Sequence, residues 1–184
     1  CMVQKKLGAS CPCLDVNCAC SSFIYALDTA AGFFARRKVR KMLVIGAERI
    51  SGIIDWNDRS TAVIFGDGAG AVLLEEGDNY LASRLTASGN DEIIRIPNYS
   101  GDSPFYKGVK EAPYIMMNGQ ETFKFAVKSM CRDIQDVAGQ AGIPVSDIDW
   151  VVPHQANSRI IDFAKKKLDI PQERFLMNIN KFGN

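Results

Sequence analysis

The sequence predicts an α/β fold in which helices and strands alternate along the chain. Two observations support this prediction. Short, unbroken apolar runs such as MLVIGA (42–47) and AVLL (71–74) have the length of strands buried on both faces. Longer stretches with helical periodicity lie between such runs, and segments with glycine or proline separate the two kinds. The pattern is typical of layered proteins in which helices cover a mostly buried sheet.

Composition narrows the class of protein. The chain has 184 residues, of which 47% are apolar and 23% charged, and its formal net charge is +1. Nothing in this balance points to nucleic acid or to an anionic membrane, and no apolar run reaches membrane-spanning length. We therefore expect a cytoplasmic protein that binds neither. The first residue is Cys1 and the last four are KFGN, with no closing element, which indicates a piece of a longer chain.

The first elements surround a cluster of cysteines in SCPCLDVNCACSSF (10–23). LDV (14–16) predicts the end of a strand, and residues 21–38 predict a helix whose apolar side chains occupy most of its circumference, so that it should be buried. Cys20 then lies at the N-terminus of this helix, where unpaired N–H groups and the helix dipole favour a thiolate. Such a thiol is a candidate nucleophile.

Other uses of the cysteines are less consistent with the spacing. Zinc sites favour C-x₂₋₄-C pairs with further ligands, whereas this cluster has C-x-C pairs and the chain has a single histidine far away. A disulfide scaffold is disfavoured because no secretion signal is present. A thiol metal-binding protein nevertheless stays open as an alternative class.

The middle of the chain predicts strands. We expect one strand over residues 40–48 and two over 59–76, and the latter two meet at a bend that contains Gly66, Gly68 and Gly70. These glycines are too closely spaced for a dinucleotide-binding loop. EEGDNY (75–80) predicts a boundary, so we divide the chain into 1–77 and 78–184. A further strand is expected within 80–88, and a polar loop over 88–117.

The last third predicts two helices that flank a strand. Asn118 is the expected N-cap of a helix that ends at Gly142 and Pro144. Ser146 is the expected N-cap of a short turn that follows. A strand over 149–154 delivers His154 at its end. A helix over 156–170 follows with an inner stripe of Ile161, Ala164 and Leu168, and then a last strand over 174–179.

Cysteine, histidine and asparagine in this order fit two classes of enzyme. A papain-like protease has the same residue set, but its C-G-[SA]-C-[WY] signature is absent around NCACSSF. The second class is a condensing enzyme. Five segments resemble, in the same order, the central part of the β-ketoacyl-acyl-carrier-protein synthase III family of the thiolase superfamily. They are DVNCACSSFIYAL, NDRSTAVIFGDGAGAVLLE, MNGQETFKFAV, DIDWVVPHQANSRII and NKFGN.

This resemblance implies a thiolase-like layered α/β/α fold of two duplicated halves, incomplete at both ends. It implies a role for each matching position. The catalytic residues are Cys20 as the acylated nucleophile, His154, and Asn184 of the Gly-Asn turn. Arg59 and Asn157 match positions that contact coenzyme A and its pantetheine arm. Arg159 matches a carrier-protein docking residue, and Lys166 and Lys167 extend that surface, although a merely solvated face explains these lysines equally well.

The resemblance also implies the reaction. An acyl-coenzyme A primer acylates the cysteine, and malonyl-acyl carrier protein then loses carbon dioxide and condenses with it, initiating fatty acid biosynthesis. No metal or redox cofactor is needed, because coenzyme A and phosphopantetheine enter as substrates. The expected partners are acyl carrier protein, acyl-coenzyme A and a second copy of the chain in a homodimer. The expected location is the cytoplasm, as for a bacterial enzyme of this type.

The chain departs from the family pattern at three positions near the nucleophile. Ser21 and Ser22 follow the cysteine where small residues or glycine are usual, and Cys18 stands where alanine is common. The family's segments on both sides, including the loop that completes its oxyanion hole, are not in this sequence. A related enzyme of polyketide-type specialised metabolism and an inactive fragment of the fold therefore stay open as alternatives.

Overall fold

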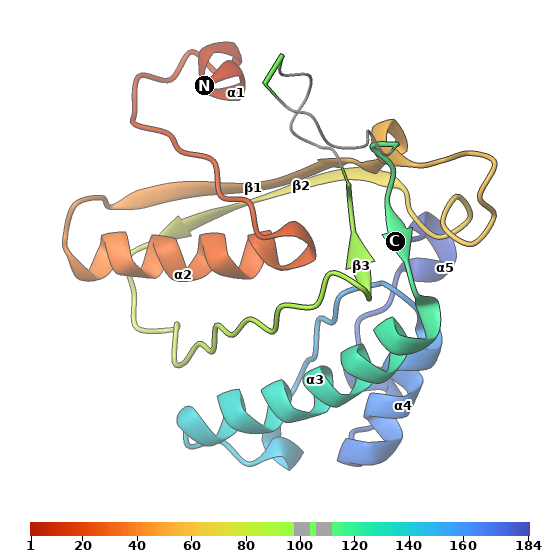
Figure 1. Cartoon of the computed structure of the whole chain (residues 1–184). Helices are drawn as coiled ribbons and strands as arrows, with labels where there is room; N and C mark the ends of the chain where they lie inside the picture. The colour runs from red at the N-terminus through yellow and green to blue at the C-terminus, as the bar shows by residue number, and fades with distance from the viewer. Residues whose placement is uncertain (98–103, 106–111) are drawn as a thin grey trace. The chain divides into compact units, whose positions relative to one another are not determined.

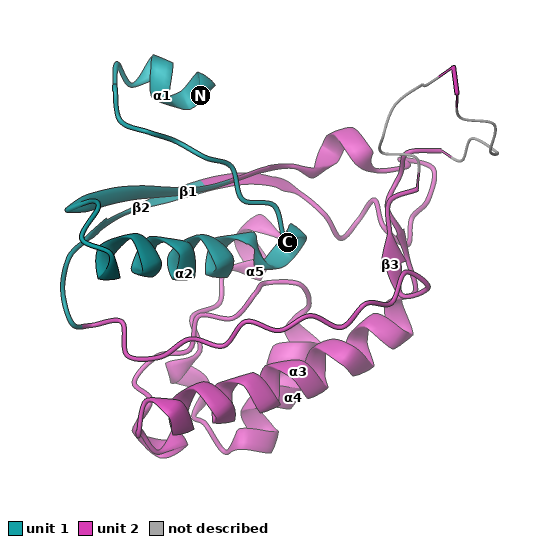
Figure 2. Ribbon diagram, turned by 60° about the vertical axis from the view of Figure 1, so that its left-hand side comes forward, with its two compact units in different colours: residues 1–46, 70–78 teal, residues 47–69, 79–184 magenta. Residues whose placement is uncertain are grey.

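A computed structural model describes residues 1–97, 104–105 and 112–184 of the chain (Figure 1). The chain divides into two compact units (Figure 2). The first comprises residues 1–46 and 70–78, and the second comprises residues 47–69 and 79–184. The boundary predicted at 77/78 concerns two duplicated halves, and it stays a prediction.

The first unit pairs a helix with a two-stranded sheet. Its helical segments are α1 (Met2–Lys6), the 3₁₀ turn η1 (Ala19–Ser21) and α2 (Ser22–Ala35), and it contains most of β1 (Lys41–Arg49) and β2 (Asp67–Glu75). The Glu76 N–H donates to the Arg40 carbonyl at 3.3 Å, so the end of β2 lies beside the start of β1 and the strands are antiparallel. Helix α2 runs along this sheet (Figures 1 and 2).

Burial in the first unit is less than the sequence predicts. Helix α2 and strands β1 and β2 are confirmed as elements, but in α2 only Ala30 is fully buried, and Ile24 is 50% exposed. In β1 only Val44 is buried, and β2 is almost entirely exposed. Apolar composition predicts that a face will be covered, but burial also requires a packed second layer. In the described part of this unit, α2 supplies such a layer on one face of the sheet.

Two predicted strands, over residues 14–16 and in the first part of 59–76, do not form. Residues 14–16 are irregular, because no described strand pairs with them. Residues 58–65 form helical turns instead of a strand, with the N–H groups of Thr61 and Ala62 bonded to the Asp58 carbonyl at 3.2 and 2.9 Å. The Asp58 carboxylate also accepts hydrogen bonds from Ser60 and Thr61. Side chains of this kind offer the backbone an alternative to a sheet.

The second unit contains short antiparallel strands and most of the helices. Strand β3 (Ile94–Arg95) pairs with β4 (Met116–Met117), Ile94 opposite Met117. These strands lie in the predicted loop 88–117, of which 98–103 and 106–111 lie outside the described residues. No strand forms over 80–88. Instead, Arg84 forms ion pairs with Asp133 and Asp136 and thereby attaches this segment to the next helix.

The predicted helices of the last third are confirmed. Helix α3 (Gly119–Gln140) begins at Asn118, whose side chain accepts from the Glu121 N–H at 3.2 Å, and it ends before Gly142, which has a φ of +68°. Helix α4 (Ser158–Leu168) packs against α3 (Figure 1). The core beneath them has Ile161, Ile170 and Phe175 at its centre, with six partly buried neighbours: Met130, Ile134, Val145, Val151, Leu168 and Met177.

The remaining segments are short. They are the 3₁₀ turns η2 (Ile50–Ile53), η3 (Val145–Asp147) and η4 (Gln172–Arg174) and the helix α5 (Ile179–Phe182). Ser146 does not cap η3, since its hydroxyl bonds Asp147 instead. The strands predicted over 149–154 and 174–179 reduce to one parallel bridge between Val151 and Phe175. Proline at position 153 has no N–H to extend the ladder, and this limits the strand.

Lys165 is a buried lysine that the sequence did not single out. Its side chain is 7% exposed, and its ammonium donates to Asp162 and Gln172 at 3.1 and 2.7 Å and lies 5.5 Å from the centre of the Phe175 ring.

Lys165→Ala removes these bonds and the packing of the alkyl stem. We expect it to lower the free energy of unfolding by about 1–3 kcal/mol. The neighbouring Lys166 is exposed, so Lys166→Ala is a matched control expected to change stability by less than about 0.5 kcal/mol. Urea unfolding measures both. Equal midpoints for the two variants would show that the buried contacts of Lys165 contribute nothing.

Candidate active site

Cys20 lies in the tight turn that begins helix α2, as the sequence predicts. It is the central residue of η1 (Ala19–Ser21), and α2 follows at Ser22. The residue is exposed, so a thioester in solution can reach it. At the start of α2, backbone N–H groups have no partners within the helix, and they favour negative charge near Cys20.

The turn around Cys20 is held by side chains on both sides of it. Ala19 has a φ of +48°, an unusual value for a residue with a β-carbon. The Asn17 side chain accepts from the Ala19 N–H at 3.2 Å. The Ser22 hydroxyl accepts from the Cys18 N–H at 2.8 Å and donates to the Ala19 carbonyl at 2.7 Å. Sequence reasoning treated Ser22 only as a departure from the family pattern, whereas it stabilises the bend that presents the thiol.

The other cysteines do not form a metal site. None of the six is in a disulfide, and the described part of the chain contains no group of three or more potential ligands from His, Cys, Asp and Glu. The sulfurs of Cys1 and Cys13 lie 3.3 Å apart on the surface. Cys131 is buried in α3, and this burial raises the pKa of its thiol. Cys131 therefore behaves as a small apolar residue.

His154 follows the parallel bridge at Val151 and precedes helix α4 in the second unit. Burial lowers the pKa of its imidazole below the ordinary value of 6.5, although the residue as a whole is exposed. Protein on several sides of the ring disfavours its charged form even where one side meets solvent. A neutral imidazole has one N–H to donate and one nitrogen to accept.

Asn184 is held at the end of the chain by a close backbone contact. Helix α5 ends at Gly183, with a φ of +73°, and the Asn184 carbonyl accepts from the Gly66 N–H at 2.6 Å. A β-carbon on Gly66 would lie 3.4 Å from that carbonyl oxygen. The sequence predicted that Gly66 serves a tight bend. Its place in the structure instead permits close approach of the segment that carries Asn184.

The predicted substrate-contacting residues occupy the surface of the second unit. Asn157 is the N-cap of α4, and its side-chain oxygen accepts from the Arg159 N–H at 2.9 Å. Arg159, Lys166 and Lys167 on α4 are exposed. Arg59 is also exposed, in the turn that follows Asp58. Their accessibility is compatible with ligand binding but does not distinguish it from solvation.

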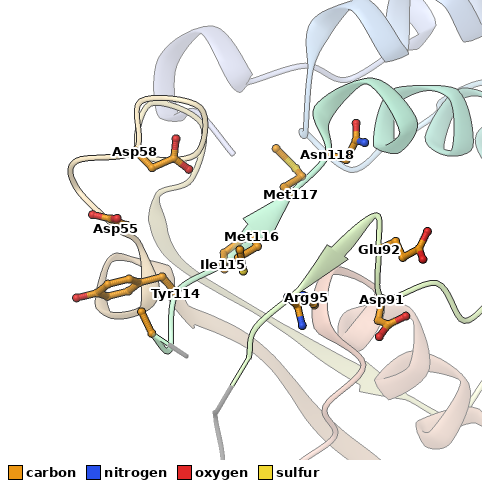
Figure 3. A pocket seen from close by; sticks show the side chains of 11 residues that line it. Asp55, Asp58, Asp91, Glu92, Arg95, Tyr114, Ile115, Met116, Met117 and Asn118 are labelled. Carbon is orange, nitrogen blue, oxygen red and sulfur yellow. The ribbon is translucent and has the colours of Figure 1, made fainter. Parts of the chain in front are cut away.

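A separate hollow in the second unit has a different character. Its volume is about 830 Å³, and its lining includes four acidic residues and one arginine (Figure 3): Asp55, Asp58, Asp91, Glu92 and Arg95. Hydrogen bonds that Ser60 donates lower the pKa of Asp58. The bond from the Ser60 side chain contributes most, and the bond from its backbone N–H comes second. The excess of carboxylates makes this hollow unsuitable for the phosphates of coenzyme A. None of the predicted site residues lines it.

The second unit thus brings the His154 loop and the Asn184 segment into one hydrogen-bonded body. The link is the side chain of Gln155, which hydrogen-bonds the carbonyls of Pro153 and Leu176 and the N–H groups of Asn178 and Ile179. The sequence had assigned Gln155 no role. Cys20 belongs to the first unit, so the meeting of the three predicted catalytic side chains stays a prediction. The described residues contain no helix that is both long and apolar enough to cross a membrane.

Comparison with known proteins identifies related chains. The family model for 3-oxoacyl-[acyl-carrier-protein (ACP)] synthase III matches residues 14–89, and the model for the C-terminal part of the same enzyme matches residues 138–184. The beta-ketoacyl-[acyl-carrier-protein] synthase III of Clostridium acetobutylicum is 43% identical over the whole chain, which covers 58% of that protein.

Solved structures agree with this result. The 3-oxoacyl-[acyl-carrier-protein] synthase III of Aquifex aeolicus matches with a TM-score of 0.89 at 42% identity, and the chain covers 57% of it. The corresponding Thermus thermophilus synthase matches with a TM-score of 0.89 at 37% identity, over 58% of its length. The chain therefore has the thiolase-like condensing-enzyme fold that the sequence predicts and spans a little over half the length of these relatives.

Proposed function

Because this chain belongs to the 3-oxoacyl-[acyl-carrier-protein] synthase III family, we propose that it is the central part of an enzyme that initiates fatty acid biosynthesis. The enzyme condenses an acyl-coenzyme A primer with malonyl-acyl carrier protein to give 3-oxoacyl-acyl carrier protein. The observation that carries this proposal is Cys20 in an exposed, side-chain-held turn at the start of α2, within a chain 43% identical to a synthase III.

In the first stage the Cys20 thiolate attacks the carbonyl carbon of the primer thioester. The coenzyme A thiolate leaves, and the acyl group stays on sulfur. Negative charge on the carbonyl oxygen requires hydrogen-bond donors, and the backbone N–H of Cys20 is one that the turn can supply. Asn17 and Ser22 are positioning residues in this stage, since their side-chain hydrogen bonds hold the turn.

In the second stage malonyl-acyl carrier protein replaces coenzyme A. The bond to its carboxylate breaks, carbon dioxide leaves, and the electron pair passes to the thioester, where an enolate forms. The His154 N–H and the Asn184 side-chain amide donate to the enolate oxygen. The lowered pKa of His154 favours the neutral imidazole for this role. The enolate carbon then attacks acyl-Cys20, and the Cys20 thiolate leaves.

Each step balances without a metal or redox cofactor, because coenzyme A and the phosphopantetheine of the carrier are parts of the substrates. Arg59 and Asn157 are proposed to contact coenzyme A and the pantetheine arm. The proposed assembly is a homodimer in the cytoplasm. Among the alternatives, an enzyme of specialised metabolism is not favoured, since the chain is 43% identical to synthase III relatives.

Incubation of the complete natural polypeptide with acetyl-coenzyme A tests the proposal directly. Intact-mass and peptide mass spectrometry should show one acetyl group, located on Cys20. Acetylation at another cysteine, or none at all, would contradict the proposed function.

Arg159→Glu tests the carrier-docking surface. Arg159 is an exposed cation proposed to dock the carrier protein, so reversal of its charge should weaken use of malonyl-acyl carrier protein by roughly tenfold or more in kcat/KM. The rate with a malonyl thioester too small to dock should change little. Arg132→Glu, on the exposed part of α3, is the matched control. An equal effect on both thioesters would remove Arg159 from the docking surface.

A further inference from the structure

We propose that the side chain of Gln155 is a spacer that sets the separation between the His154 loop and the segment ending in Asn184. Gln155 is then a positioning residue for the decarboxylation step, and this role rests on the proposed function. The inference depends only on contacts within the second unit.

A parallel bridge between Val151 and Phe175 precedes His154. The Val151 N–H donates to the Arg174 carbonyl at 2.8 Å, and the Leu176 N–H donates to the Val151 carbonyl at 3.0 Å. In a regular parallel ladder the next two bonds would run from the N–H of residue 153 to the Leu176 carbonyl, and from the Asn178 N–H to the carbonyl of residue 153. Residue 153 is proline, which has no N–H, so the first of these bonds cannot form.

The Gln155 amide occupies the place of both missing bonds. Its Nε2 donates to the Leu176 carbonyl at 3.1 Å and to the Pro153 carbonyl at 2.9 Å. Its Oε1 accepts from the Asn178 N–H at 3.0 Å and from the Ile179 N–H at 3.1 Å. The side chain therefore acts as an inserted peptide group between two diverging backbone segments.

These four bonds use the full capacity of a primary amide, which has two hydrogens to donate and two lone pairs to accept with. They also determine its orientation. Two carbonyls face the nitrogen and two N–H groups face the oxygen, so the reversed amide would satisfy none of them. A residue with the same length and only one kind of polar atom cannot replace it.

The insertion has a geometric consequence for the site. Directly paired strands lie about 4.8 Å apart, and an amide hydrogen-bonded on both sides holds the two segments farther apart than that. Pro153 directly precedes His154, and Ile179 begins the short helix α5 that leads to Asn184. The spacer thus acts at the backbone position directly before His154 and at the start of the helix that leads to Asn184.

Contacts on both sides of the Gln155 side chain fix the ends of the two backbone segments, so their separation depends on this side chain. Before the bridge, Arg174 donates to the carbonyls of Ser146 and Ile148, at 2.5 and 3.0 Å. Beyond α5, the Gly66 N–H holds the Asn184 carbonyl. Both ends are therefore attached to the rest of the unit, and the separation in the middle depends on the side chain of residue 155.

Two substitutions test the spacer in the complete natural polypeptide. Gln155→Ala removes all four bonds, and Gln155→Asn keeps the amide but shortens the side chain by one methylene. We expect both to slow malonyl decarboxylation by about a hundredfold, since displacement of a catalytic group by about 1 Å has this effect. Acetylation of Cys20 should change far less. Gln140→Ala, at the exposed end of α3, is the matched control and should change neither.

Three results would overturn the spacer. They are equal loss of acetylation and decarboxylation, unchanged decarboxylation in Gln155→Ala, and full activity in Gln155→Asn. If Gln155→Ala does not fold, Gln155→Asn decides the question by the same measurements.

NMR separates failure of the spacer from failure of the proposed function. His154 is the sole histidine of this sequence, and comparison with a His154→Ala variant identifies its ring signals in the complete polypeptide. If the unsubstituted protein catalyses neither half-reaction, the proposed function fails. The spacer would still require Gln155→Ala to shift the ring signals of His154 and the side-chain amide signal of Asn184, whereas Gln140→Ala leaves them in place. Unchanged signals in Gln155→Ala would exclude the spacer.

Discussion

Replacement of Cys20 by alanine will abolish transfer of the acetyl group from acetyl-coenzyme A to the protein. The thiolate forms the bond to the primer, and alanine has no nucleophilic atom to replace it. Loss of a nucleophile of this kind reduces turnover on the order of a millionfold. The acetylated species should therefore disappear from the intact-mass spectrum, and condensation should fall to the background rate.

Neighbouring cysteines provide the controls for this experiment. Cys18 lies two residues before Cys20 and is part of the same held turn, and Cys13 is exposed nearby. Cys18→Ala and Cys13→Ala should keep acetylation on Cys20. An acetyl adduct that persists in Cys20→Ala, at the stoichiometry of the unsubstituted protein, would mean that another residue is the nucleophile.

His154→Ala is expected to slow decarboxylation of malonyl-acyl carrier protein by roughly a hundredfold to a thousandfold, the effect of removing one donor to a developing oxyanion. Acetylation of Cys20 should be affected less, because the imidazole is assigned to the second stage. Single-turnover acetylation and release of carbon dioxide measure the two stages separately. Equal loss in both would show that His154 acts mainly on the thiol.

The pKa of His154 makes a further check on this assignment. Burial lowers it below 6.5, so the imidazole stays neutral at neutral pH and becomes charged only as the pH falls through the lowered pKa. For stability, the folded state resists protonation, so stability is complete above the unfolded pKa near 6.5 and declines as the pH falls below it. NMR titration of the His154 ring should give a midpoint below 6.5, and a midpoint above it would contradict burial as the cause.

The helices were the most predictable part of the fold. Asn118 caps α3, Gly142 follows its end, and Ile161 and Ala164 face the core of α4, because capping and helical periodicity are local properties of a sequence. The sheet was predicted less well. The strands expected over 59–66 and 149–154 required partners from distant segments, and Asp58 and Pro153 acted locally against them.

Residue type and order by themselves determined the family, the fold and the proposed roles of Cys20, His154 and Asn184, since such motifs are short and contiguous. The tertiary structure alone decided how Ser22 holds the turn at Cys20, why Gly66 meets the Asn184 backbone, and that Gln155 lies between two segments more than twenty residues apart in sequence. The physical reason is that a polar side chain satisfies whichever backbone groups the fold brings within hydrogen-bonding distance, and those groups lie far from it in the sequence.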